Sequence, residues 1–292
     1  MKVGLVIGDY TWDGGPARMA DTLVEIAQTA DDTGFSIVGV GDHLWQGAHY
    51  GGPEAPFLES FTALTMIAAN TRRCRVAPVM AGVNFRHPSL LAKMVTSLDV
   101  LSGGRAMLGI GVGWDETEAQ GLGIPYPSLT ERFERLEETV QICLRMWEGE
   151  RGDEQPFDGK HYRLERALNL PQSITRPRPP IMIAGGGEKK TLRLVARYAD
   201  ACNLYPGPEL PAKLDVLRGH CEAEGRDYDA IEKTCIFPFD MGEGVNADSL
   251  VEMLGGLGGL GVQTAIGILA GPDPVRQVEL IGKRVIPAVA DA

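Results

Sequence analysis

Residues 75–114 constrain the fold most, because two apolar runs lie on either side of a helix-like segment. Residues 76–83 form an apolar run with polar neighbours, which is typical of a strand buried on both faces. Apolar residues from Leu91 to Leu98 then recur at helical spacing, and a second apolar run follows at residues 106–111. A strand, a helix and a strand within about forty residues predict a parallel βαβ unit with a right-handed crossover.

The same alternation continues along the whole chain of 292 residues. The other strand-like runs are residues 3–7, 36–40, 181–184, 200–204, 231–239 and 262–269. Helical segments are expected between them, among others at residues 58–69, 208–224, 247–254 and 273–289. Eight strands that each precede a helix predict a single-domain (β/α)8 TIM barrel over residues 1–292, with insertions at its C-terminal mouth.

Three segments need a separate interpretation. Residues 149–179 are rich in glycine, proline and charge and are too long for an ordinary loop, so we expect a functional insertion over the barrel mouth. The glycine-rich run at residues 255–261 precedes a strand, which predicts a turn at the opposite, stability face rather than a phosphate loop. Asp31 and Asp32 are expected at a solvated helix end.

Charge and cysteine content limit the functional classes. The net charge of −11 argues against nucleic acid as a partner, because a nucleic-acid binder needs a basic face. Five cysteines without a CxxC pair predict free thiols in a reducing compartment, and the scattered histidines predict no metal site. The first residues are already strand-like, and no apolar run approaches the length of a membrane span. We therefore expect a cytoplasmic protein with no membrane partner.

A TIM barrel carries its active site at the carboxyl ends of its strands, and Asp42 and His43 directly follow the second strand. Histidine titrates near neutral pH and suits proton exchange, and Asp42 could orient or charge it. Adjacent side chains on a strand point to opposite faces, so one of the two could be structural. We predict that His43 faces the pocket and is catalytic.

The next two strands end in small residues, namely Ala81, Gly82, Val83 and Asn84, and then Gly111, Val112, Gly113 and Trp114. Glycine lets a flat ring approach the backbone closely, although Gly82 could equally form a plain bulge. A G-x-G is a weak dinucleotide signal, and we expect no helix directly after it, so a Rossmann site is rejected. Small residues beside an aromatic side chain suit a slot for a ring system.

The fourth cluster is Ala184, Gly185, Gly186 and Gly187, which join a strand to a helix. We expect Glu188, Lys189 and Lys190 in the first turn of that helix. Free N–H groups at a helix N-terminus favour phosphate, and successive glycines let the backbone wrap around it. A flexible glycine turn is the alternative.

Several motifs occur in a fixed order along the chain: NFRHP at residues 84–88, LAK at 91–93, LSGGR at 101–105 and GIGVGW at 109–114. Together they resemble the luciferase-like monooxygenase superfamily, and most closely its branch that uses the deazaflavin coenzyme F420. The resemblance implies that Asp42 and His43 lie against the deazaflavin ring and that the loop at residues 184–187 holds the cofactor phosphate. It also implies a non-proline cis peptide behind the ring, which carries over to Gly82-Val83.

The resemblance predicts an enzyme that transfers a hydride between coenzyme F420 and a small organic substrate, with His43 polarising the substrate or exchanging the accompanying proton. Sugar-phosphate dehydrogenases of this branch carry a catalytic glutamate where this chain has Trp114, which argues against that substrate. An FMN-dependent monooxygenase of the same superfamily is the first alternative. A cofactor-binding protein without turnover, or a non-redox barrel enzyme, is the alternative from another class. The chain could assemble as a homodimer.

Overall fold

Short apolar runs form the strands of a parallel barrel in the computed structural model, which describes residues 1–148, 154–239, 246–271 and 273–290. Within these residues, the barrel strands are β1 (Lys2–Ile7), β2 (Ile37–Val40), β3 (Arg75–Pro78), β4 (Ala81–Gly82), β5 (Leu108–Gly111), β8 (Ile181–Ala184), β9 (Ala201–Leu204), β10 (Glu232–Pro238) and β11 (Thr264–Leu269). They are hydrogen-bonded in the order β3-β2-β1-β11-β10-β9-β8-β5-β4. A parallel bridge between Val76 and Ala106 joins the two ends of this sheet. Since β3 and β4 are two pieces of one predicted strand, eight barrel positions result, as the sequence predicts.

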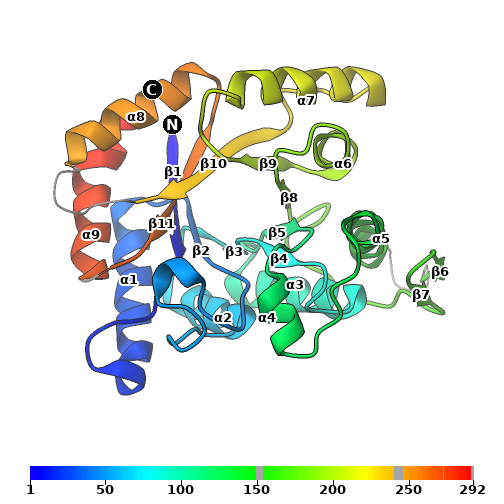
Figure 1. The fold of residues 1–292 in the computed structure, drawn as a ribbon, viewed down its shortest axis with the longest axis horizontal. Coiled ribbons are helices and arrows are strands. Elements are labelled where there is room, and N and C mark those ends of the chain that lie inside the picture. Colours follow the sequence, from blue (N-terminus) through cyan, green and yellow to red (C-terminus); the bar gives the residue numbers. More distant parts are fainter. Residues whose placement is uncertain (149–153, 240–245, 272, 291–292) are drawn as a thin grey trace.

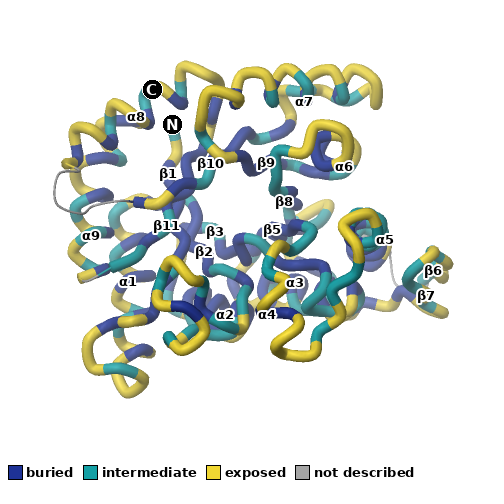
Figure 2. Tube along the Cα trace, in the orientation of Figure 1, coloured by how far each residue is buried: buried dark blue, intermediate teal, exposed yellow. Residues whose placement is uncertain are grey.

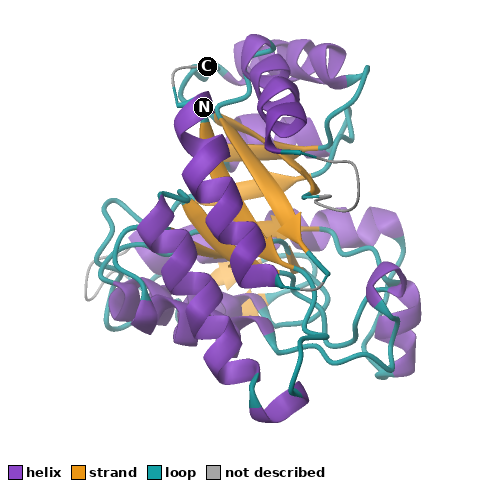
Figure 3. Ribbon diagram, turned by 90° about the vertical axis from the view of Figure 1, so that its left-hand side faces the viewer, coloured by secondary structure: helices purple, strands orange, loops and turns teal. Residues whose placement is uncertain are grey.

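Helices surround the strands in Figure 1 and Figure 3. They are α1 (Met19–Thr33), α2 (Ser60–Asn70), α3 (Pro88–Ser102), α4 (Glu116–Gly121), α5 (Leu129–Glu148), α6 (Thr191–Tyr198), α7 (Leu210–Glu224), α8 (Ala247–Gly259), α9 (Pro274–Leu280) and α10 (Ile286–Val289). A π-helical turn, Ile281–Val285, connects the last two. Within the described residues, no helix is both long enough and apolar enough to cross a lipid bilayer.

Alternate residues along the strands pack into two separate hydrophobic cores. Leu5 and Ile7 of β1 belong to the larger core shared with the helices, whereas Val6 belongs to a smaller core with Ile37 and Met182. This alternation follows the period of two in a strand and fills the barrel interior with side chains. Figure 2 shows the strands and the inner faces of the helices buried, with exposure concentrated on the outer turns.

Three sequence expectations about the elements were wrong. The run at residues 76–83 is interrupted between β3 and β4, and the non-proline cis peptide is Val79-Met80 rather than Gly82-Val83. The glycine-rich run does not form a turn as a whole, because α8 continues through Gly259. A short helix, α4, also begins at Glu116, two residues after Trp114, where none was expected.

The insertion expected over the mouth lies elsewhere. Its first five residues, 149–153, lie outside the described residues. A hairpin of β6 (Phe157–Asp158) and β7 (Arg163–Leu164) follows, with the backbone N–H groups of residues 160–162 bonded to Glu138 of α5. Asp99 near the end of α3 then accepts the N–H groups of Ile174 and Thr175 at 2.7 and 2.9 Å. The described part of the segment therefore packs along α3 and α5, outside the barrel (Figure 1).

Candidate active site at the mouth of the barrel

The four clusters predicted from the sequence meet at one end of the barrel. They follow β2, β4, β5 and β8, and parallel strands bring their carboxyl ends to the same edge. The strand registers place Gly82 beside Gly111 and Ile110 beside Ile183, so the residues just beyond these strands become neighbours. We therefore place the candidate site at this mouth.

His43 is held by a residue that the sequence did not single out. Its Nδ1 lies 2.7 Å from Oε2 of Glu118 on α4. Burial alone would lower the pKa of His43, but Glu118, with smaller contributions from Asp42 and Asp115, raises this pKa above its ordinary value. The neighbouring acids therefore favour the protonated form of the His43 ring.

Aromatic side chains surround the His43 ring. The Trp114 ring meets it edge-on at a centroid distance of 5.2 Å, and the Phe57 ring does so at 6.2 Å. Tyr10, which follows β1, is fully buried against Phe57, and within the described part of the chain its hydroxyl has no hydrogen-bond partner. Trp114 itself is 68% exposed, which leaves an apolar surface at the mouth beside the histidine.

Asp42 points away from the His43 ring and into a buried ion pair. Both of its carboxylate oxygens accept from Arg86, at 2.7 and 2.9 Å, and one also accepts the Gly82 N–H at 3.1 Å. Burial raises the pKa of Asp42, while the Arg86 guanidinium opposes that rise. Asp42 therefore holds the end of β4 through the Gly82 N–H, and it affects His43 by raising the pKa of that residue through its charge.

The ends of β4 and β5 form a ledge with little side-chain bulk. Gly113 has a φ of 74°, and a Cβ there would collide with Oδ1 of Asn84. That Oδ1 is buried and has no hydrogen-bond partner among the described residues. A Cβ on Gly111 would meet no atom nearer than 3.9 Å. A Cβ on Gly82, in contrast, would meet Phe85 and Asn84, at 3.0 and 3.1 Å, so Gly111 is the glycine of this ledge that leaves room for a flat ring; Ala81 and Val83 are buried.

Arg132 on α5 fixes the loop that carries Gly113 and Trp114. Its guanidinium donates to the carbonyl oxygen of Gly113 and stacks on the Tyr126 ring at 4.1 Å. The Tyr126 hydroxyl in turn donates to the carbonyl oxygen of Trp114 at 3.0 Å. These contacts could not be predicted from the sequence, because neither Arg132 nor Tyr126 follows a strand.

The glycine loop after β8 is open and lies beside the cationic side chain of Lys213. Gly185 has a φ of 119°, and its N–H donates to the carbonyl oxygen of Asn203, whereas a Cβ on Gly186 would meet only Lys213, at 3.8 Å. Helix α6 begins at Thr191, so Glu188, Lys189 and Lys190 precede it instead of forming its first turn. Lys213 pairs with Glu188 at 2.6 Å. Glycine backbone and lysine side chains at this position suit a phosphate group.

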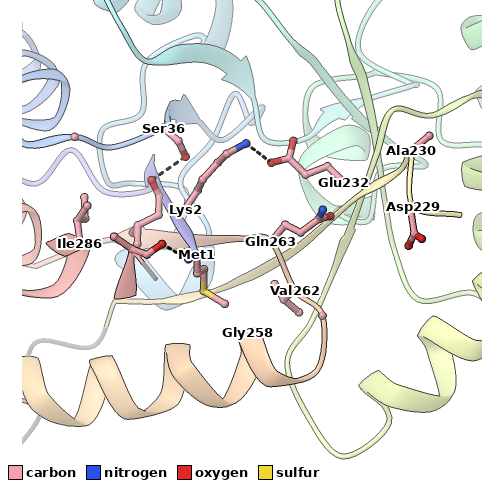
Figure 4. Close-up of a pocket in the computed structure, with 14 residues that line it drawn as sticks. Met1, Lys2, Ser36, Asp229, Ala230, Glu232, Gly258, Val262, Gln263 and Ile286 are labelled. Carbon is pink, nitrogen blue, oxygen red and sulfur yellow. Dashed lines mark hydrogen bonds and ion pairs between the residues drawn. The ribbon is translucent and has the colours of Figure 1, made fainter. Parts of the chain in front are cut away.

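A cleft of about 860 Å³ opens at the opposite end of the barrel (Figure 4). Its polar groups bond to protein groups: the Met1 ammonium to Val289, Ser36 to Val3, and Lys2 to Glu232 at 3.4 Å. These contacts lie at the amino ends of the strands, where barrel residues serve stability. We therefore assign the chemistry to the mouth and not to this cleft.

Comparison with known proteins gives matches in both sequence and structure. A family model described as luciferase-like monooxygenase matches residues 1–244. An F420-dependent glucose-6-phosphate dehydrogenase from Gordonia bronchialis is 32% identical over 225 residues, which cover 72% of this chain. The chain spans only 62% of that relative's length.

Two solved structures share the fold. The monooxygenase RslO1 from Streptomyces bottropensis matches with a TM-score of 0.82 at 20% identity, over 98% of this chain and 99% of that one. The F420-dependent tetrahydromethanopterin reductase from Methanopyrus kandleri matches with a TM-score of 0.76 at 18% identity, over 98% and 99%. At these identities the likeness establishes the barrel fold alone.

Proposed function

The chain belongs to the luciferase-like monooxygenase family, and on that premise we propose that it transfers a hydride between coenzyme F420 and a small organic substrate. The observation that carries the proposal is the mouth itself, where His43 and Trp114 lie beside the glycine ledge of β4 and β5. The similarity to F420-dependent dehydrogenases over 72% of the chain supports the choice of cofactor.

The residues at the mouth fit such a cofactor. Gly185, Gly186 and Gly187, with Lys213 beside them, would hold its phosphate group. The ledge at the ends of β4 and β5 would support the ring, and Gly111 would leave room for its close approach. When bound, a deazaflavin supplies a ring carbon that takes or gives two electrons together as a hydride.

His43 and its aromatic neighbours would act on the substrate. When the substrate is oxidised, its carbon gives a hydride to the cofactor and the attached oxygen or nitrogen gives up a proton. Nε2 of His43 would receive that proton. Trp114, Phe57 and the exposed Tyr205 beyond β9 would contact the substrate and limit the access of water.

Trp114 narrows the substrate class. The indole offers one N–H donor and no carboxylate, so it cannot act as an acid or base. We therefore propose a substrate that is not a sugar phosphate, although the relatives that support the cofactor act on glucose 6-phosphate by name. An FMN-dependent monooxygenase remains the second candidate, because RslO1 shares the fold.

Assembly and location are proposed on separate observations. Leu90 and Leu101 on the outer face of α3, with Ile174 beside it, are more than half exposed. A second copy of the chain would cover this apolar face, which the molar mass in solution tests. The five cysteines are buried and unpaired, which supports a reducing, cytoplasmic location.

A paired redox assay tests the proposed function. The protein is mixed with oxidised F420 and a panel of alcohols, amines and sugar phosphates, and the visible deazaflavin band is followed. We expect loss of the band with an unphosphorylated substrate and no change with glucose 6-phosphate. Incorporation of labelled oxygen into a product with reduced FMN, without any F420 chemistry, would instead establish the monooxygenase.

A further inference from the structure

Glu118 contacts three consecutive residues of the loop that follows β2. Its side chain is only 2% exposed. One oxygen, Oε2, lies 2.7 Å from Nδ1 of His43, while Oε1 accepts the N–H groups of Leu44 and Trp45, the latter at 2.8 Å. The carboxylate thus ties the catalytic loop to α4, a helix about 75 residues further along the chain.

We propose that Glu118 is the positioning residue of His43, which it holds through Nδ1 so that Nε2 exchanges the proton at the mouth. The inference rests on the proposed function. A carboxylate accepts hydrogen bonds and cannot donate them, so Nδ1 carries the hydrogen. Nε2 is then an acceptor in the neutral ring and a donor in the cation. Among the described residues, no group hydrogen-bonds to Nε2.

The charges around the ring agree with this arrangement. Glu118 and Asp115 face it from α4 and its N-cap, and Asp42 adjoins it in the chain. The cation of Arg86 is engaged by Asp42 and Glu59 at 2.7 and 2.6 Å. Burial would raise the pKa of Glu118, but its bonds from His43, Leu44 and Trp45 lower it overall, so this carboxylate is charged wherever His43 titrates.

Asp42 cannot take the place of Glu118 as the group that orients the ring. Its carboxylate oxygens bond to Arg86 and to the Gly82 N–H, and among the described residues no hydrogen bond joins Asp42 to His43. Asp42 therefore affects His43 through its charge, whereas Glu118 acts through direct contact.

A metal ion accounts for the cluster less well than the hydrogen bonds do. His43, Asp115 and Glu118 have donor atoms within 4.8 Å of one another, which could suggest a metal site. Yet Asp115 caps the Glu118 N–H at 2.9 Å, and Oε1 of Glu118 is taken by backbone N–H groups. The donors are already used in hydrogen bonds.

Nuclear magnetic resonance of the full chain, without cofactor, tests the proposal directly. In ¹⁵N-labelled wild type, neutral His43 should be protonated at Nδ1. Glu118→Gln can still accept the loop N–H groups through its oxygen, but its amide donates to Nδ1. The variant should therefore show the opposite tautomer, a lower His43 pKa and a turnover at least about tenfold slower, with unchanged cofactor affinity.

Glu116→Gln makes the same change on an exposed residue of the same helix and should alter none of these signals. A wild-type His43 protonated at Nε2 would overturn the proposal even if the Gln variant did not fold. Stoichiometric Zn²⁺ binding that displaces the Nδ1 proton would overturn it too. So would unchanged His43 signals in a destabilised Glu118→Gln protein, since Glu118 would then only clamp the loop. If wild-type protein shows the Nδ1 tautomer but no F420 chemistry, the proposed function fails while Glu118 still holds the ring.

Discussion

The ring of His43 lies between a buried acid and an exposed indole. Glu118 bonds to Nδ1 at 2.7 Å, and the Trp114 ring lies 5.2 Å away. Packing and hydrogen bonding together fix the ring, while the charges of the neighbouring acids decide how readily it gains a proton. Substitution of His43 and a change of pH therefore test different properties of the ring.

Removal of the imidazole should affect the chemical step and spare the cofactor. We expect His43→Ala to slow turnover by about 10²–10⁴-fold, the usual contribution of a general acid or base, with cofactor affinity within a few-fold of wild type. Turnover, fluorescence titration and melting temperature are measured on this variant and on His49→Ala, an exposed histidine, as control. Unchanged turnover at saturating cofactor and substrate would remove His43 from the mechanism.

The raised pKa of His43 predicts opposite pH dependences for the two directions of reaction. Substrate oxidation needs the neutral ring to accept a proton, so kcat/KM should rise with pH through a value above the ordinary 6.5. Substrate reduction needs the protonated ring and should fall over the same range. Profiles that run in the same direction for oxidation and reduction would contradict proton transfer by His43.

Residues that directly follow a strand could be predicted, because the barrel geometry alone brings them to the mouth. His43, Asn84 and Gly113 were found in this way. The roles of Glu118 and Arg86 could not be predicted in this way. Glu118 contacts His43, 75 positions away in the chain, and Arg86 contacts Asp42, 44 positions away. No local sequence pattern encodes such pairs. The position of Glu118 shortly after the end of β5 was nevertheless a signal for a residue at the mouth.

One carboxylate at the end of α1 holds the backbone segment that leads into β3. Asp31 was expected in solvent, but it is 5% exposed and accepts the N–H groups of Arg72, Arg73 and Cys74 at 2.7–2.9 Å. Its neighbour Asp32 does lie in solvent, where it pairs with the Arg73 side chain at 2.8 Å. The sequence could not separate the two, because helix phase near a terminus is poorly defined.

The two aspartates give a matched stability test. Burial would raise the pKa of Asp31, but the three backbone N–H groups lower it below its ordinary value. Its stabilisation is therefore present at neutral pH and is lost as the pH falls below about 4 toward the folded-state pKa. We expect Asp31→Asn to lose about 1–3 kcal/mol at pH 7, with the difference from wild type shrinking in acid.

Urea unfolding of both variants over a range of pH checks this expectation. Asp32→Asn should change the free energy of unfolding by less than about 0.5 kcal/mol at any pH. An equal effect of the two substitutions, or an Asp31→Asn deficit that persists undiminished at low pH, would contradict the assigned role of Asp31.

At the scale of the whole molecule, the barrel could be predicted because each βα unit carries its own periodic signal. The expected order of strands and helices was confirmed, including the β5 unit that follows the central helix. Elsewhere the structure differs from what the local sequence predicts. Helix α8 extends into the glycine-rich run that predicts a turn. The segment after α5 is hydrogen-bonded to Glu138 and Asp99 and does not cover the mouth. These outcomes depend on partners far away in sequence.

We propose that the mouth holds a deazaflavin, and cofactor binding to wild type and to two variants of the glycine loop tests this proposal. Gly186→Ala adds a Cβ that meets only Lys213 at 3.8 Å and should bind like wild type, whereas Gly186→Asp places a carboxylate where the phosphate would lie. Equilibrium titration with F420 and with FMN, followed by absorbance, should show F420 binding in preference to FMN and its loss in Gly186→Asp alone. Tight FMN binding with no F420 binding, or wild-type F420 affinity in Gly186→Asp, would contradict the account.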